Sequence, residues 1–165
     1  MATTDPKYLI KSIIETYVTA NPIKKDDDLT EASTIHVYER GPEDIKGLFF
    51  VENYDVIFFY GEPRVRSQRQ IQDVPVHFLM SYPVTVVSVD KHDPFLGTLV
   101  CTGSKMQAWA RIRLRVAVSA SAQSAAGAVP AYVLTIIQEQ GKNEWSAGIN
   151  VWSTQYILEW TTGGP

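Results

Sequence analysis

Apolar residues near the start of the chain recur with the period of an α-helix. They occupy positions i, i+1, i+4, i+5, i+8 and i+9 and therefore lie on one stripe. The members of this stripe are Leu9, Ile10, Ile13, Ile14, Tyr17 and Val18. Asp5 is a suitable N-cap, Pro6 fits the first helical position because its missing N–H would be unpaired there, and Asn21-Pro22 ends the helix. The pattern predicts an amphipathic helix over residues 6–20.

Two short segments after this helix have the composition of β-strands. Residues 35–40 are rich in β-branched and aromatic side chains and end at the turn-forming Gly41-Pro42. Residues 54–60 are almost continuously apolar, and Gly61-Glu62-Pro63 interrupts the run. A strand that is apolar on both faces is typical of a sheet centre covered on each side, or of a strand packed at a subunit boundary. The sequence leaves these two alternatives open.

A longer strand is predicted over residues 71–90 because apolar and polar residues alternate there. The apolar register consists of Val74, Val76, Phe78, Met80, Tyr82, Val84 and Val86. Pro75 and Pro83 occupy the other register, which indicates a sheet edge or a bend, because proline cannot donate to a strand ladder. A strand of this length exceeds the usual size, so we expect part of its apolar face to pack against another subunit.

Residues 103–123 fit both a helical and a strand pattern. Several apolar residues have helical spacing, and Ser104-Lys105-Met106-Gln107 fits a capping box, whereas residues 111–118 also alternate as a strand would. We favour a helix because the cap precedes the segment and because alanine and arginine are good helix formers.

The chain closes with two predicted strands, over residues 132–140 and 145–160, which a hairpin connection at residues 141–144 joins. On the second strand, one face carries Trp152, Tyr156, Leu158 and Trp160. The order of elements predicts an α+β fold in which a mainly antiparallel sheet has two helices packed on one face. No repeat or boundary divides residues 1–165, which we interpret as a single domain.

Composition limits the classes of protein that the chain fits. Its 165 residues, 45% of them apolar, suffice for one globular domain with a sizeable core, and its net charge of −3 is small. The single Cys101 excludes an intramolecular disulfide and a cysteine-based zinc cage. The longest apolar runs fall far below the ~20 residues of a membrane-spanning helix, and the N-terminus lacks a signal-peptide pattern. We therefore expect neither a secreted nor a membrane-spanning protein.

The sequence lacks the common motifs for catalysis and cofactor binding. Its ten glycines form neither a phosphate-binding loop nor a dinucleotide fingerprint, and no nucleophile-elbow serine motif is present. His36, His77 and His92 lack metal-binding spacing, and Cys101 has the setting of a small packing residue. The Asp26-Asp27-Asp28 run fits a solvated connection, with a hard-cation site as the alternative. We expect a protein that is not an enzyme and that uses no cofactor or metal.

Arginines form the best candidate for a functional surface. They are Arg64, Arg66 and Arg69, within residues 61–70, a segment predicted to be a loop between two strands. Such a loop contacts phosphates, pairs with carboxylates of a neighbouring subunit, or remains solvated. The slightly acidic chain lacks a broad basic footprint, which favours a protein partner or solvent over nucleic acid. A second set, Arg111, Arg113 and Arg115, would point in diverging directions on a helix and form surface or subunit salt bridges.

Three stretches of the chain are similar to a known family. They are the helix Lys7–Val18, the segment Ser104–Trp109 after the long strand, and the ending Asn143–Trp160, in which a Trp-Ser step precedes an alternating strand. In these stretches and in its order of elements, the chain resembles the tail terminator proteins of long-tailed phages and related tailed viruses. Residues 22–53 look like an insertion relative to that family. The resemblance implies an α+β fold of the tail-terminator type.

The resemblance also implies a function. The protein would be a virion structural protein of the tail or neck, assembled in the host cytoplasm. It would form a homohexameric ring that caps the tail tube, ends its polymerisation and joins the tail to the head connector without catalysis. Its partners would be the tail tube protein, the head connector or a neck protein, and DNA that passes through the lumen without specific binding; no membrane would be involved. The candidate subunit or partner interface consists of Arg64, Arg66, Arg69, Phe78, Trp152 and Trp160.

Two other functions compete with this interpretation. Another neck or tail-completion protein would share the ring and differ in its position in the virion. A cone-shaped α+β ligand-binding domain would instead form a pocket around His77, Tyr82 and Trp152. His77 occupies the opposite register from Tyr82, so strand alternation disfavours the pocket.

Overall fold

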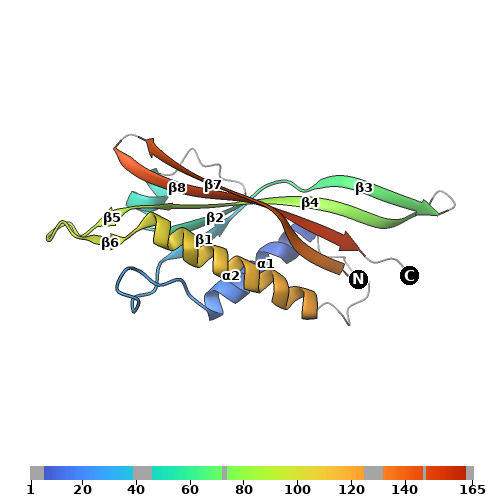
Figure 1. The fold of residues 1–165 in the computed structure, drawn as a ribbon, viewed down its shortest axis with the longest axis horizontal. Helices are drawn as coiled ribbons and strands as arrows, with labels where there is room; N and C mark the ends of the chain where they lie inside the picture. The colour runs from blue at the N-terminus through green and yellow to red at the C-terminus, as the bar shows by residue number, and fades with distance from the viewer. Residues whose placement is uncertain (1–5, 39–45, 72–73, 125–131, 147, 163–165) are drawn as a thin grey trace.

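The computed structural model describes residues 6–38, 46–71, 74–124, 132–146 and 148–162 (Figure 1). Its elements in chain order are α1 (Pro6–Ala20), β1 (Thr34–Val37), the π-helical turn η2 (Gly47–Val51), β2 (Val56–Tyr60), β3 (Arg64–Ile71), β4 (Val74–Val89), β5 (Lys91–His92), β6 (Leu99–Cys101), α2 (Gly103–Ser124), β7 (Tyr132–Ser146) and β8 (Ile149–Thr162). The predicted helix over residues 6–20 is confirmed, and its proposed N-cap Asp5 lies outside the described residues.

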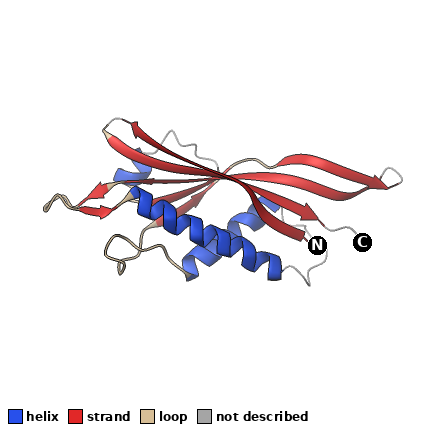
Figure 2. Ribbon diagram, in the orientation of Figure 1, coloured by secondary structure: helices blue, strands red, loops and turns tan. Residues whose placement is uncertain are grey.

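A six-stranded sheet forms the centre of the molecule. Its strand order is β1-β2-β4-β8-β7, and β3 pairs with β4 beyond the end of β2. β1 and β2 run parallel, and the other pairs are antiparallel. The long helices α1 and α2 both cover one face of this sheet (Figure 2). The predicted α+β class with a mainly antiparallel sheet is therefore confirmed, and β5 and β6 add a small separate hairpin.

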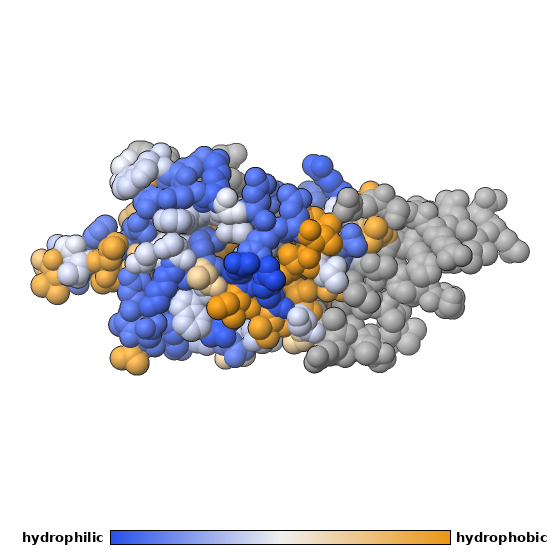
Figure 3. Space-filling model, in the orientation of Figure 1, coloured by the Kyte–Doolittle hydropathy of each residue, from blue (hydrophilic) through white to orange (hydrophobic). Residues whose placement is uncertain are grey.

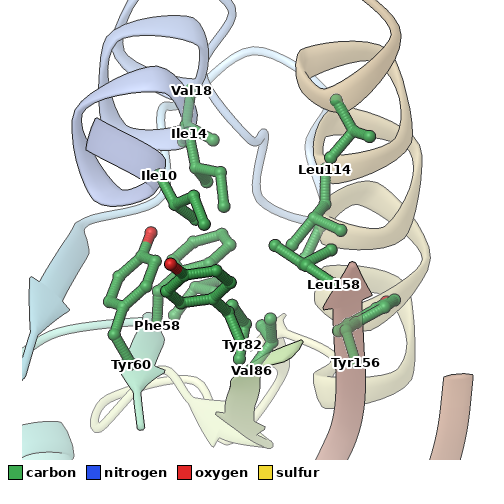
Figure 4. Close-up of a cluster of buried hydrophobic side chains, with 14 of the residues drawn as sticks. Ile10, Ile14, Val18, Phe58, Tyr60, Tyr82, Val86, Leu114, Tyr156 and Leu158 are labelled. Carbon is green, nitrogen blue, oxygen red and sulfur yellow. The ribbon is translucent and has the colours of Figure 1, made fainter. Parts of the chain in front are cut away.

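The main core fills the space between the two helices and the sheet (Figure 4). The predicted apolar stripe supplies the buried Ile10, Ile14 and Val18 from α1. From the sheet, the even register of β4 and the closing strand contribute Tyr82, Val84, Val86, Tyr156, Leu158 and Trp160. Because every second residue of a strand points to the same face, the strand period predicted this face correctly.

A second, smaller core lies on the opposite face of the sheet. Leu48 and Phe49 of η2 pack there against Ile57 and Phe59 of β2, together with apolar residues of β4 and β8. All five residues of β2 are buried as a result. Of the two alternatives that the sequence left open for this strand, coverage on both faces within one subunit is the observed one.

Two segments predicted to be loops belong to strands. Residues 64–70 of the predicted loop 61–70 belong to β3, and residues 141–144 continue β7, where Gly141 pairs with Thr154 of β8. Both segments are polar, and the described side chains of Lys142, Asn143 and Glu144 are exposed. The ladder is built from backbone groups, so an edge strand needs no apolar register to form. The hairpin turn therefore falls between Ser146 and Ile149 rather than at 141–144.

The helix predicted over residues 103–123 is confirmed as α2, but the capping box is wrong. The Gln107 side chain turns toward the sheet, where its amide donates to the backbone oxygens of Val86 and Trp152 at 3.0 Å each. Carboxylates distant in the sequence instead accept hydrogen bonds from backbone N–H groups at the start of the helix. Asp90 accepts the Gly103 N–H at 2.7 Å, and Asp26 accepts the N–H of the preceding Thr102 at 2.9 Å.

β4 changes its partner on one edge near Pro83. Residues 84–88 pair with β2, whereas residues 74–81 pair with β3. On the other edge, pairing with β8 begins only at Leu79. The far half of β4 therefore leaves the body of the sheet with β3 alone, among the described strands, as a two-stranded ribbon (Figure 1). We call β3 together with residues 74–81 of β4 the arm.

Candidate functional site

The predicted arginine cluster lies on the arm. Arg64, Arg66 and Arg69 belong to β3, which pairs with β4 from Arg64↔Ser81 to Ile71↔Val74, so the prediction of a basic loop is wrong. The strand contains three arginines and no acidic residue. The Arg64 side chain is exposed, as is 58% of Val65. The side chains of Arg66 and Arg69 lie outside the described part of the structure.

The other residues predicted at an interface occupy different settings. Phe78 belongs to the arm, where its backbone is paired with that of Gln68, and its side chain lies outside the described part. Trp160 is only 4% exposed and packs in the main core, so we reassign it to the stability of the subunit. Trp152 is half-buried against the start of α2 at Gly103. Neither tryptophan belongs to a large exposed apolar surface.

Two of the three predicted arginines of α2 converge on one partner, and the third points elsewhere. Arg111 and Arg115 are four residues apart and lie on one side of the helix. Both pair with Glu139 of β7, at 2.8 Å from Arg111 Nε and 2.6 Å from Arg115 Nη2. Arg113 instead stacks over the Trp109 ring at 5.0 Å. Arg111 and Arg115 therefore tie α2 to β7 within one subunit. Of the two predicted roles, surface salt bridges are observed for these two arginines, and a role between subunits stays a prediction.

Large apolar side chains are exposed together at the end of the molecule opposite the arm. We call this surface the apolar end. It consists of Phe50 and Val51 of η2, Phe95, Leu96 and Leu99 of the β5–β6 hairpin, and Trp145 of β7. Phe95 is 93% exposed, Leu96 78% and Trp145 75%. In the space-filling view, the β5–β6 hairpin forms a narrow apolar projection at this end (Figure 3).

The tip of the β5–β6 hairpin is a rigid turn. Asp93 Oδ1 accepts the N–H groups of both Phe95, at 2.7 Å, and Leu96, at 2.8 Å. The Gly97 N–H donates to the Asp93 oxygen at 2.9 Å, and Gly97 has a φ of 69°, which glycine adopts without strain. Two hydrogen bonds to the Asp93 side chain and one to its backbone oxygen therefore fix the backbone of this turn. Preorganisation of this kind lowers the entropic cost of binding.

A cleft of about 640 Å³ opens beside this tip. Its lining includes Phe50 and Trp145 from the apolar end, Pro94 from the β5–β6 hairpin, Asp90 just after β4, and Asn150 of β8. Asn150 donates to Asp90 Oδ2 at 2.9 Å while Asp90 Oδ1 accepts the Gly103 N–H, so this carboxylate is already engaged. The cleft thus combines apolar walls with a fixed polar floor.

A buried ion pair anchors the inner side of the cleft. Lys91 Nζ lies 3.1 Å from Asp55 Oδ1, and both side chains are almost fully buried. Asp55 Oδ2 also accepts the Ser33 N–H at 2.8 Å, and Lys25 approaches it at 3.5 Å. The Cys101 thiol donates to Asp55 Oδ1 at 3.5 Å. These bonds join β5, β6 and the segment after α1 to Asp55, which immediately precedes β2, so the cleft is built on a rigid base.

The structure assigns structural roles to the candidate chemical groups that it describes. Burial, and then the charge of Asp55, raises the pKa of Cys101 to about 12, so the thiol stays protonated and unreactive. His36 stacks on Phe58 at 4.5 Å, and its Nδ1 lies 2.8 Å from the Tyr60 hydroxyl. His92 is exposed, and the His77 side chain lies outside the described part.

The three consecutive aspartates each have a separate protein partner. The Thr102 hydroxyl donates to Asp26 at 2.5 Å, Asp27 accepts from Thr30 and Leu29, and Asp28 pairs with Lys105 at 2.8 Å. The bond from the Thr30 hydroxyl, above all, lowers the pKa of Asp27 to about 2. Within the described residues, no group of three acidic, histidine or cysteine side chains is arranged to hold a metal ion.

The pocket of the ligand-binding alternative does not form around its proposed residues. Tyr82 is 2% exposed and belongs to the main core, and Trp152 packs at the start of α2. The cleft at the apolar end was not predicted from the sequence. Its one local signal was the adjacent pair Phe95-Leu96 between the turn-forming Asp93-Pro94 and Gly97.

The fold and its surfaces define an α+β protein with a projecting arm and an exposed apolar end. No protein-family model matches the chain, and comparison with curated proteins finds no related sequence. None of the helices in the described part is long and apolar enough to cross a membrane.

Proposed function

We propose that the protein is a virion structural protein that forms a ring, caps the tail tube, ends its polymerisation and joins the tail to the head connector. It acts through surfaces rather than catalysis. The projecting arm is the observation that carries this proposal. The resemblance to tail terminator proteins is the reason for proposing a ring at the end of a viral tail.

The arm is a poor structure for an isolated subunit. Its outer part, beyond the pairing of Leu79 with β8, is a two-stranded ribbon, and a ribbon without a helix or further strand over it is marginally stable in water. Within the described strands, residues 74–78 of β4 pair only with β3, and 58% of Val65 is exposed. Contact with a neighbouring subunit would supply the surface that the arm lacks, and repetition of that contact around an axis gives a ring.

On the sheet face opposite α1 and α2, the part that η2 leaves uncovered suits the wall of an aqueous channel. Val84, Val86 and Tyr156 point into the main core, so the alternating residues of these strands point to the other face. A shallow depression there is lined by Thr85, Gln140, Gly141, Lys142, Ser153 and Gln155. This surface is polar and carries little charge, which fits passage of DNA without specific binding.

Light scattering tests the ring directly. The mass of the purified protein should approach six times the 18.5 kDa of one chain over a range of concentration and salt, and negative-stain images should show a central channel. A gel-shift assay should find no stable complex with double-stranded DNA. A monomer at every concentration, or a compact oligomer without a channel, contradicts the proposal.

A further inference from the structure

We infer that the apolar end receives the arm of a second copy of this chain, so that neighbouring subunits join head to tail. This inference rests on the proposed ring and names the two surfaces that would close it. It combines the exposed area, the charge and the placement of the two surfaces.

The apolar end is large enough to take part in a stable contact. Full burial of an aromatic side chain removes roughly 150–250 Å² of surface, so the exposed parts of Phe50, Phe95 and Trp145 supply on the order of 500 Å². Val51, Leu96 and Leu99 bring this surface toward the ~800 Å² that each partner buries in a standard interface. Isolated subunits rarely expose so much apolar surface in one place.

The charges around the two surfaces are opposite. The elements that form the apolar end also carry the carboxylates of Glu52, Asp93 and Glu144, of which Glu144 pairs with Lys142. Asp90 lines the adjoining cleft, where Gly103 and Asn150 already engage its carboxylate. Lys91 contributes little positive charge to the cleft because Asp55 neutralises it. The arm carries three arginines on β3, a strand that contains no acidic residue. This complementarity favours the arm over a second apolar end, which would bring like charges together.

The placement of the surfaces requires a contact between copies. The β5–β6 hairpin and the β7–β8 turn lie at one end of the long axis and the arm lies at the other (Figure 1). A subunit therefore cannot bring its own arm to its own apolar end. A contact between different surfaces is heterologous, and it generates a ring when the rotation between neighbours closes.

Two variants separate the surfaces. Phe95→Ser/Leu96→Ser removes the exposed tip of the apolar end, and Arg64→Glu/Val65→Ser alters the base of the arm. Leu29→Ser is the matched control, because Leu29 is 80% exposed and belongs to neither surface. All these side chains are exposed, so circular dichroism and thermal melting should match the wild type.

Light scattering of each variant, and of an equal mixture, then gives the decisive result. The wild type and Leu29→Ser should assemble, whereas each surface variant alone should remain a monomer. The mixture should form dimers of one chain of each kind and nothing larger, because one intact arm meets one intact apolar end.

Several outcomes overturn the inference. Assembly of either surface variant at the wild-type mass does so, as does a mixture that remains monomeric. Dimers of the arm variant alone would instead indicate contact between two apolar ends. If the wild type forms a ring and both surface variants still form it, this inference is rejected but the proposed function is not. If the wild type is a monomer at every concentration, the inference and the proposed function are both rejected.

Discussion

Gly61 and Pro83 are in close contact where the arm leaves the sheet. The Gly61 N–H donates to the Pro83 oxygen at 2.9 Å, and a Cβ on Gly61 would lie 2.5 Å from Pro83 Cγ. Because the N–H and C=O of a strand residue point to the same edge, the missing donor of Pro83 faces the gap between β2 and β3. A proline at this position leaves no unpaired N–H, and the bend predicted from the prolines coincides with the origin of the arm.

We expect Gly61→Ala to destabilise the protein by about 1–3 kcal/mol, the usual cost of an added methyl in a packed site. Gly141→Ala is the control, because its Cβ would make an ordinary contact at 3.7 Å from Thr154 Oγ1 and should have little effect or stabilise. Urea denaturation measures both. Equal stability of the two variants would show that the Gly61–Pro83 contact can relax.

Gly103→Ala should also destabilise, against the helix preference of alanine. Alanine is favoured over glycine in helices by about 1 kcal/mol, but a Cβ at Gly103 would lie 2.3 Å from Cδ1 of Trp152. We expect the contact to dominate, with a net loss of about 1–3 kcal/mol in urea denaturation. In a Trp152→Leu background the loss should disappear, and its persistence there would assign the effect to another cause.

Asp55→Asn should be the most destabilising of these substitutions. It leaves Lys91, whose side chain is 10% exposed, without its buried counter-ion, and breaking such a pair costs about 3–5 kcal/mol. Glu144→Gln disrupts an ion pair with Lys142 whose two side chains are more than half exposed, and it should cost no more than about 1 kcal/mol. The comparison uses chemical denaturation at neutral pH, and similar losses would contradict the structural role of the Asp55–Lys91 pair.

His36 should make stability depend on pH. Burial, and secondarily the charge of Lys11, lowers its pKa from 6.5 to about 4 in the folded protein. Between these values the unfolded chain binds more protons, so the free energy of unfolding should fall as the pH falls from 6.5 to 4, by at most about 3 kcal/mol. His36→Asn should be less stable at neutral pH and show a weaker dependence in denaturation series. The exposed His92→Asn should retain the wild-type slope, and an unchanged slope in His36→Asn would exclude His36 as the cause.

Periodic apolar residues predicted the elements that build the core. Three patterns identified side chains that are buried in the core. They are the helical stripe from Leu9 to Val18, the alternation before Val86, and the strand face shared by Tyr156 and Leu158. The ambiguous segment after Gly103 resolved as a helix because Met106, Ala110 and Leu114 pack on the sheet at helical spacing. The spacing of apolar residues within one helix or strand shows which of its faces is buried, and these predictions were therefore correct.

The sequence by itself thus determined the α+β class, both long helices and the long central strand. Tertiary structure alone decided that the arginines of residues 64–69 belong to a strand, and that Arg111 and Arg115 converge on Glu139. It also brought Phe50, Pro94 and Trp145 to one cleft, from three separate parts of the chain. Polar edge strands and composite surfaces depend on backbone pairing and on contacts between distant segments, and neither leaves a period in the sequence.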